Sequence, residues 1–158
     1  MPENIVTYKN KNKPKKIIII NGPNLNMLGK REPKIYGNKT LKEIEKECFD
    51  YSNKINFNID FFQSNSESEI ISRIQKSVNY DGLIINAGAF THTSIAIHDA
   101  LKSVKLPKVE VHISNIYNRE DFRKKLFISS AVNGIIAGFG TNVYLIALES
   151  IKIFLNNE

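Results

Sequence analysis

Hydrophobic residues fall into short aliphatic runs, separated by longer stretches in which apolar positions recur with helical period. Short runs bounded by turn residues are typical of buried strands, and the amphipathic stretches between them are typical of crossover helices. The pattern therefore predicts an α/β fold with a mostly parallel sheet. The five expected strands cover residues 16–21, 56–63, 82–86, 108–113 and 134–139.

Helix starts are marked by capping sequences. Thr40 and Glu43 have the spacing of a capping box, in which the hydroxyl and the carboxylate each accept from an unpaired backbone amide, and Ser66 begins a second such sequence. Two further helices are indicated by apolar residues at three-to-four spacing. The expected helices cover about 40–54, 66–78, 94–103 and 142–155.

The length and composition favour one domain without a membrane span. A chain of 158 residues buries one core. The longest aliphatic run, 17–20, is far shorter than the roughly 20 residues that a membrane helix needs. Cys48, the single cysteine, follows Leu41 and Ile44 at helical spacing and so lies on the same apolar face. We therefore expect it in the core. No Cys/His cluster has zinc-site spacing, and a reducing, cytoplasmic location is the default.

The formal net charge of +6 is concentrated near the N-terminus. Five lysines lie between Lys9 and Lys16, around a proline and without an apolar period. We therefore expect residues 1–15 to be a basic flexible extension and residues 16–158 to form the domain. The other interpretation is an arm that binds nucleic acid, but a solvated tail accounts for the excess charge without such a partner.

The segment after the first strand is the first candidate for chemistry. In an open parallel sheet of order 2-1-3-4-5, ligands bind beyond the carboxyl ends of the strands, where the order reverses between the first and third strands. Residues 21–37 form a long stretch without apolar period at that point, with glycines at both ends and cations at Lys30, Arg31 and Lys34. This pattern predicts a lid that closes over an anion, with a mobile surface loop as the alternative.

Arginine usage points to the same end of the sheet. The chain has 18 lysines and only four arginines, yet Arg31, Arg119 and Arg123 all fall in the loops at the proposed site. A guanidinium holds a carboxylate through two parallel hydrogen bonds, which lysine cannot do. The fourth arginine, Arg73, is expected at the surface of the second helix.

Three titratable residues at these strand ends suggest acid–base chemistry. Glu110 and His112 point to the same face of a strand, so the carboxylate can orient the imidazole. Tyr36 lies in the lid among cations that favour a phenolate, which would act as a general base. Taken singly, a strand histidine is more often structural and such a tyrosine more often packs in the core.

Four motifs, in order and spacing, closely resemble those of type II 3-dehydroquinate dehydratases, from about Lys16 to the C-terminus. They are Asn21-Gly22-Pro23-Asn24-Leu25-Asn26; Arg31-Glu32-Pro33 with Tyr36-Gly37; Asn86-Ala87-Gly88-Ala89 with Thr91-His92-Thr93-Ser94; and Glu110-Val111-His112-Ile113-Ser114-Asn115 with Arg119 and Arg123.

The resemblance implies a flavodoxin-like, doubly wound, five-stranded parallel sheet in a single domain, assembled as a homododecamer, a tetramer of trimers. It implies a cofactor-independent lyase that converts 3-dehydroquinate to 3-dehydroshikimate by anti elimination through an enolate. This reaction belongs to the shikimate pathway of chorismate and aromatic amino acid synthesis. No metal is expected, and neither nucleic acid nor membrane is an expected partner.

The resemblance also implies roles for individual residues. Tyr36 would be the base and Arg31 would favour its phenolate, both on the lid. Asn24 would position the water that stabilises the enolate, and His112, supported by Glu110, would protonate the departing hydroxyl. The implied substrate-binding residues are Asn86, His92, Ile113, Ser114 and Arg123, with Arg119 placing the lid and Asp99 reaching the site of a neighbouring subunit.

One stretch departs from the family, because residues 125–129 replace a His-Ser-Tyr-like run. Two other classes of function stay open on the sequence alone. A non-catalytic flavodoxin-like module would bind a phosphate or nucleotide through the first loop, although that loop has neither GxGxxG nor a P-loop sequence. A basic nucleic-acid adaptor would bind with steep salt dependence through residues 1–15.

Overall fold

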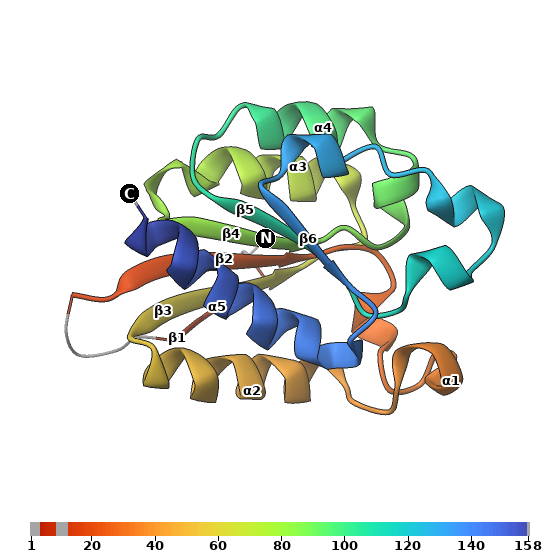
Figure 1. The fold of residues 1–158 in the computed structure, drawn as a ribbon, viewed down its shortest axis with the longest axis horizontal. Coiled ribbons are helices and arrows are strands. Elements are labelled where there is room, and N and C mark those ends of the chain that lie inside the picture. The colour runs from red at the N-terminus through yellow and green to blue at the C-terminus, as the bar shows by residue number, and fades with distance from the viewer. Residues whose placement is uncertain (1–3, 9–12, 158) are drawn as a thin grey trace.

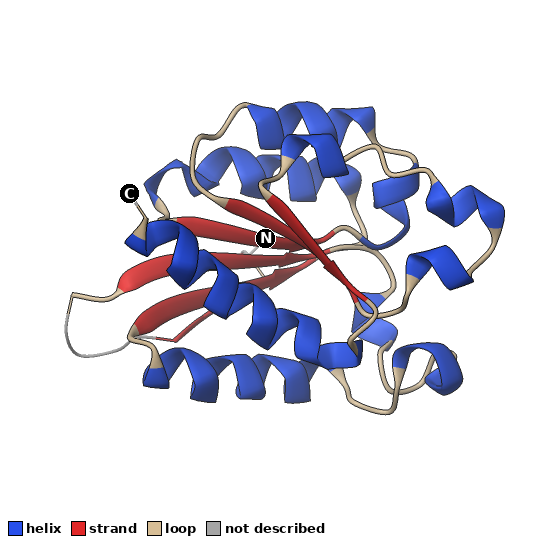
Figure 2. Ribbon diagram, in the orientation of Figure 1, coloured by secondary structure: helices blue, strands red, loops and turns tan. Residues whose placement is uncertain are grey.

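The fold, seen in a computed structural model that describes residues 4–8 and 13–157, is one sheet between two layers of helices (Figures 1 and 2). The sheet has the order β1-β3-β2-β4-β5-β6. Five of its strands are parallel in the expected order: β2 (Lys15–Asn21), β3 (Phe57–Gln63), β4 (Gly82–Asn86), β5 (Lys108–His112) and β6 (Gly134–Ala137). The α/β fold and its strand order are therefore confirmed.

The sixth strand corrects the sequence prediction. β1 (Ile5–Tyr8) lies in the part expected to be a flexible extension, and pairs antiparallel with β3, with Tyr8 opposite Ile59. Its residues are β-branched or aromatic and therefore favour a strand. The lysines that led to the prediction follow this run, and residues 1–3 and 9–12 lie outside the described residues. Tyr8 stacks on Phe49 at 4.3 Å between ring centroids and donates a hydrogen bond of 2.5 Å to Glu45.

Three other expected strands are one or two residues shorter than predicted, two of them because of local turns. β3 begins at Phe57 because Asn56 has a positive φ of 58°, which is incompatible with a strand. β6 ends at Ala137 because the chain turns at Gly138, whose φ is 90°. β5 ends at His112, one residue before the expected end.

Helices cover both faces of the sheet, as Figure 2 shows. One face packs on α2 (Leu41–Lys54) and α5 (Val143–Asn156), and the other on α3 (Glu67–Gln75) and α4 (Ile95–Lys102). The isoleucines at 17–20 alternate between the two cores, so β2 is covered on both sides.

Local sequence signals at the helices are mostly confirmed. The Thr40–Glu43 capping box forms both of its hydrogen bonds, and Cys48 is fully buried in the core beneath α2. The prediction for Arg73 is wrong, since it is buried, with its guanidinium 5.0 Å from the ring centroid of Phe62. Its long stem packs while the charged head lies over an aromatic face.

The connections contain short helical turns rather than plain loops. The expected lid, residues 21–37, includes the 3-10 turn η1 (Leu25–Met27) and one turn of α-helix, α1 (Pro33–Tyr36), with proline at its first position. The other 3-10 turns are η2 (Lys76–Asn79), η3 (Gly88–His92), η4 (Ile116–Asn118), η5 (Asp121–Lys124), η6 (Ser129–Ala131) and η7 (Gly140–Asn142). At the right of Figure 1, α1 and the β5–β6 connection extend beyond the carboxyl ends of the strands.

Candidate active site

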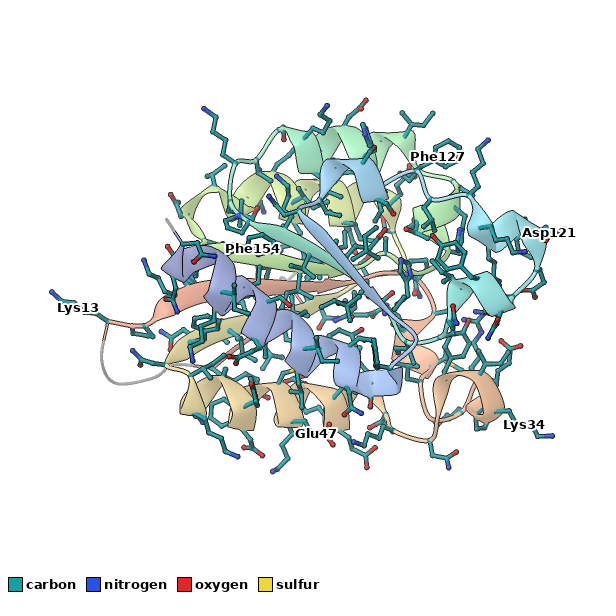
Figure 3. The ribbon with its side chains drawn as sticks, in the orientation of Figure 1. Lys13, Lys34, Glu47, Asp121, Phe127 and Phe154 are labelled. Carbon is teal, nitrogen blue, oxygen red and sulfur yellow. The ribbon has the colours of Figure 1, made fainter. Side chains whose placement is uncertain are left out.

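A small cavity lies at the carboxyl ends of β2, β4 and β5, where the strand order reverses. Its volume is about 50 Å³. Ten of the twelve residues singled out from the sequence line it: Asn24, Arg31, Tyr36, Asn86, His92, His112, Ile113, Ser114, Arg119 and Arg123. Figure 3 shows Lys34 and Asp121, from α1 and η5, at this end of the molecule, pointing outward. The topology thus brings the segments that follow β2, β4 and β5 to one place.

Tyr36 is held between two guanidinium groups. Its hydroxyl accepts a hydrogen bond of 2.6 Å from Nη1 of Arg119, and the Arg119 guanidinium carbon lies 5.2 Å from the ring centroid. The Arg31 guanidinium lies 5.3 Å from the same centroid, while its Nε is 3.6 Å from Glu32. The cation that reaches the hydroxyl is therefore Arg119, and Arg31 faces the ring. Two positive charges thus lie beside one phenol.

His112 and Glu110 form a buried pair on β5. His112 Nε2 lies 3.4 Å from Oε1 of Glu110, within ion-pair reach but without the geometry of a hydrogen bond. Glu110 is fully buried beneath the cavity, which by itself raises the pKa of its carboxyl. Interactions with His112 and with two hydroxyls outweigh burial, so the net effect is a lowered pKa. Glu110 is thus an ionised carboxylate facing the imidazole.

His92 and Arg123 form the side of the cavity next to the β5–β6 connection. His92 Nδ1 lies 2.8 Å from the backbone oxygen of Lys125, so this nitrogen carries a proton and Nε2 is left for a ligand. Burial lowers the pKa of His92, and the charges of His112 and Arg123 lower it further. Arg123 supplies a positive charge on this side of the cavity, and its Nε lies 3.0 Å from a carboxylate oxygen of Glu120.

Asn86 is fixed from below by residues that sequence reasoning did not single out as functional. Its Nδ2 donates to the Tyr144 hydroxyl at 3.1 Å, and that hydroxyl donates to Oδ1 of Asn21 at 2.5 Å. The Asn86 Oδ1 accepts from the Gly88 amide at 3.2 Å. Burial raises the pKa of the Tyr144 phenol, which therefore stays a neutral donor. The sequence held one signal for Tyr144: a tyrosine on the core-facing side of a helix usually places its hydroxyl against a polar partner.

Asn24 stands at the mouth of the cavity. It adopts a left-handed conformation, with φ of 69°, and its side chain is not used to cap η1. Its backbone amide donates to the Asn65 side chain at 3.0 Å. The carboxamide of Asn24 thus remains available to a ligand or to a water molecule.

Asp99 is not part of the cavity formed by this chain. It lies on α4, where 73% of its side chain is exposed and a carboxylate oxygen is 3.1 Å from Nδ1 of His98. Among the described residues, no group of three or more His, Cys, Asp or Glu side chains has the arrangement of a metal site. Across the same residues, no helix is long and apolar enough to cross a membrane.

Comparison with known proteins adds to this geometry. Residues 15–152 match the family model "Dehydroquinase class II". A 3-dehydroquinate dehydratase of Prochlorococcus marinus is 56% identical over 140 residues, which are 88% of this chain and 97% of that protein. One from Caldicellulosiruptor saccharolyticus is 56% identical over 147 residues, with 89% and 99% covered.

Two crystal structures are also similar. The type II dehydroquinase of Butyrivibrio crossotus has a TM-score of 0.88 at 42% identity, covering 89% of this chain and 99% of that one. The type II dehydroquinase of Propionibacterium acnes has a TM-score of 0.87 at 37% identity, with 90% and 99% covered. With the family model matching most of the sequence, the chain belongs to the class II dehydroquinases.

Proposed function

We propose that this dehydroquinase converts 3-dehydroquinate to 3-dehydroshikimate, with Tyr36 as general base and His112 as general acid. One observation carries the proposal: the Tyr36 hydroxyl, beside the Arg119 guanidinium, and the His112 imidazole, beside the Glu110 carboxylate, line the same cavity. The guanidinium can stabilise negative charge that develops on the phenol oxygen during the reaction, and the carboxylate can stabilise positive charge on the imidazole. The environments therefore separate a base from an acid.

The elimination needs two proton transfers. The Tyr36 phenolate takes the proton from the carbon next to the ketone, and the electron pair moves to the ketone oxygen to form an enolate. When the ketone re-forms, the bond to the tertiary hydroxyl breaks, and that oxygen leaves as water with a proton from His112. Tyr36 ends protonated and His112 neutral, and exchange with solvent resets both. A water molecule held by Asn24 stabilises the enolate oxygen.

Arg119 has a larger part in this scheme than the sequence alone implies. It donates a charge-assisted hydrogen bond to the Tyr36 hydroxyl, where negative charge develops when the base is formed, whereas Arg31 lies over the ring face. The guanidinium of Arg119 also lies 3.5 Å from the Ser114 hydroxyl. Arg119 therefore joins the lid to the loop after β5.

The remaining polar groups fit a hydroxylated ring acid. Arg123 offers a charge for the carboxylate, and the free nitrogen of His92 and the amide of Asn86 offer contacts for hydroxyls. Ile113 and Ser114 also line the cavity.

Assembly and pathway extend the proposal. The exposed position of Asp99 suits a contact with the site of a neighbouring subunit, as expected for trimers assembled into a dodecamer. The reaction places the enzyme in the shikimate pathway, and we propose a cytoplasmic location. A phosphate-binding module is disfavoured, because the amides of Leu25, Met27 and Leu28 donate within their own loop and are not free to surround a phosphate.

Ultraviolet absorbance of the purified protein with 3-dehydroquinate tests the proposal, because the product is a conjugated enone. We expect the enone to form with or without EDTA and after borohydride treatment, but not with Tyr36→Phe. Tyr51→Phe, which removes a hydroxyl on α2 far from the cavity, is the matched control and is expected to remain active. Absence of enone from the folded wild-type protein would exclude this function.

A further inference from the structure

Both oxygens of the buried Glu110 carboxylate accept a hydrogen bond from a hydroxyl group. Thr91 Oγ1 donates to Oε1 at 2.8 Å, and Ser129 Oγ donates to Oε2 at 2.6 Å. Thr91 follows β4, on η3, and Ser129 begins η6 in the β5–β6 connection. Two loops on opposite sides of β5 thus converge on one carboxylate.

This arrangement fixes the direction in which the carboxylate faces. Hydrogen bonds at both oxygens prevent rotation of the carboxyl plane, so Oε1 stays toward His112 at 3.4 Å. A fully buried carboxylate is costly unless such donors compensate for lost water. An ionised carboxylate can only accept hydrogen bonds, so each hydroxyl acts as the donor. Both hydrogen bonds therefore favour the charged form of Glu110.

The two hydroxyls are held in place by the segment that departs from the family pattern, residues 125–129. The Phe127 amide donates to the Thr91 carbonyl at 2.8 Å, and the Lys125 carbonyl lies 2.8 Å from Nδ1 of His92. The segment therefore ties η3 to the β5–β6 connection mainly through its backbone. Its different side chains, Lys125, Leu126 and Phe127, leave these contacts intact.

We infer that Thr91 and Ser129 are positioning residues for the acid step: they hold the Glu110 carboxylate charged and aimed at His112. The inference rests on the proposed role of His112 as general acid. Neither hydroxyl lines the cavity, so neither touches substrate. The charged or titratable groups around the cluster are His112 on β5, His92 on η3 and Arg123 on η5.

The two positions should differ in importance. Thr91 is fully buried, so Thr91→Val leaves Oε1 without a donor where water cannot replace it, while keeping the shape of the side chain. Ser129 is partly exposed, so in Ser129→Ala a water molecule can take over its hydrogen bond. Thr91→Ser keeps the hydroxyl and should restore activity.

Ser77→Ala is the matched control. Ser77 is fully buried and donates a hydrogen bond of 2.6 Å to the Ile74 carbonyl, far from the cavity. Ser77→Ala removes a serine hydroxyl, as Ser129→Ala does, but Ser77 has no hydrogen bond to Glu110. A merely structural role for Thr91 and Ser129 would lower the melting temperature as Ser77→Ala does and leave the pH dependence of the rate unchanged.

The test is kcat, KM and the pH profile of kcat for these variants, measured by enone absorbance. We expect Thr91→Val to lower kcat on the order of tenfold with little change in KM, because hydrogen bonds to charged groups are among the stronger ones. Its pH profile should also change, because Thr91→Val removes one of the hydrogen bonds that lower the pKa of the Glu110 carboxyl. Ser129→Ala should show a smaller change in the same direction, and Thr91→Ser should resemble wild type.

The inference is overturned if Thr91→Val and Ser129→Ala keep the wild-type kcat and pH profile, or if their losses appear only in KM or thermal stability. Should Thr91→Val fail to fold, Ser129→Ala decides by the same profile. Inactive wild-type protein would instead contradict the proposed function, so the two failures are distinguishable.

Discussion

Replacing Gly22 with alanine tests whether the close approach of two strand ends sets the geometry of the site. Gly22 directly follows β2, and its amide donates to the Asn86 carbonyl at 2.7 Å. A Cβ at this position would lie 2.4 Å from the Ala87 carbonyl oxygen and 2.6 Å from the Ala87 carbonyl carbon. These are backbone atoms, so no side-chain rotation relieves the overlap.

The size of the effect follows from these distances. Ordinary contacts of a Cβ begin near 3.4 Å, so the ends of β2 and β4 must separate by about 1 Å to admit the methyl group. Such overpacking costs about 1–3 kcal/mol of folding free energy. Asn86 moves with the end of β4, and a displacement of about 1 Å in a catalytic site can lower the rate roughly 100-fold.

Urea unfolding and enone-forming activity of Gly22→Ala measure both effects. Gly134→Ala, in β6, is the matched control because no atom lies within 4 Å of its added Cβ and its φ is not positive. We expect the control to keep wild-type stability and rate. If Gly22→Ala retained both properties as well, the close approach would not determine the geometry of Asn86, and the reasoning would be refuted.

Three further predictions test the supporting structure. Tyr144→Phe removes the hydroxyl that the buried side chains of Asn21 and Asn86 share, so the free energy of unfolding should fall by about 1–3 kcal/mol and KM should rise. An unchanged KM would contradict the idea that Tyr144 positions Asn86. Removing residues 1–8 should lower stability by roughly 2 kcal/mol, the value of burying one large side chain, while activity is retained; an unchanged urea midpoint would show that β1 contributes nothing. The lowered pKa of Glu110 means that its stabilising effect is present above its unfolded pKa of about 4.3 and is lost as the pH falls through the folded value. Unfolding free energy should therefore decrease less steeply in acid for Glu110→Gln than for wild type, and equal slopes in urea titrations across pH would argue against an ionised carboxylate.

The sequence predicted the parts of the fold that depend on local pattern. Buried parallel strands, the capping box of Thr40 and Glu43 and the core position of Cys48 can be recognised from a few neighbouring residues, whereas at Ser66 only the side-chain half of the predicted box forms. Polar residues at strand ends were expected to converge, because carboxyl ends of parallel strands share one edge. The expected cavity residues from the first, third and fourth strand loops do converge there.

What escaped prediction depends on contacts between distant parts of the chain. β1 is too short to be recognised alone and is a strand because β3 offers it an edge. Arg73 is buried because Phe62, on β3, provides an aromatic face. The hydroxyls of Ser129 and Tyr144 reach the site through folded geometry, and neither residue type signals such a role in isolation.

The N-terminal strand has a consequence for the behaviour of the chain in concentrated solution. β1 lies outside the matched family segment, which begins at residue 15. Without β1, the apolar sequence Phe57–Gln63 would be the sheet margin, with a row of free amides and carbonyls able to recruit strands from other molecules. With β1 in place, the outermost strand has only four residues and is followed by lysines. The segment thus protects the protein against edge-to-edge aggregation, at the margin opposite β6.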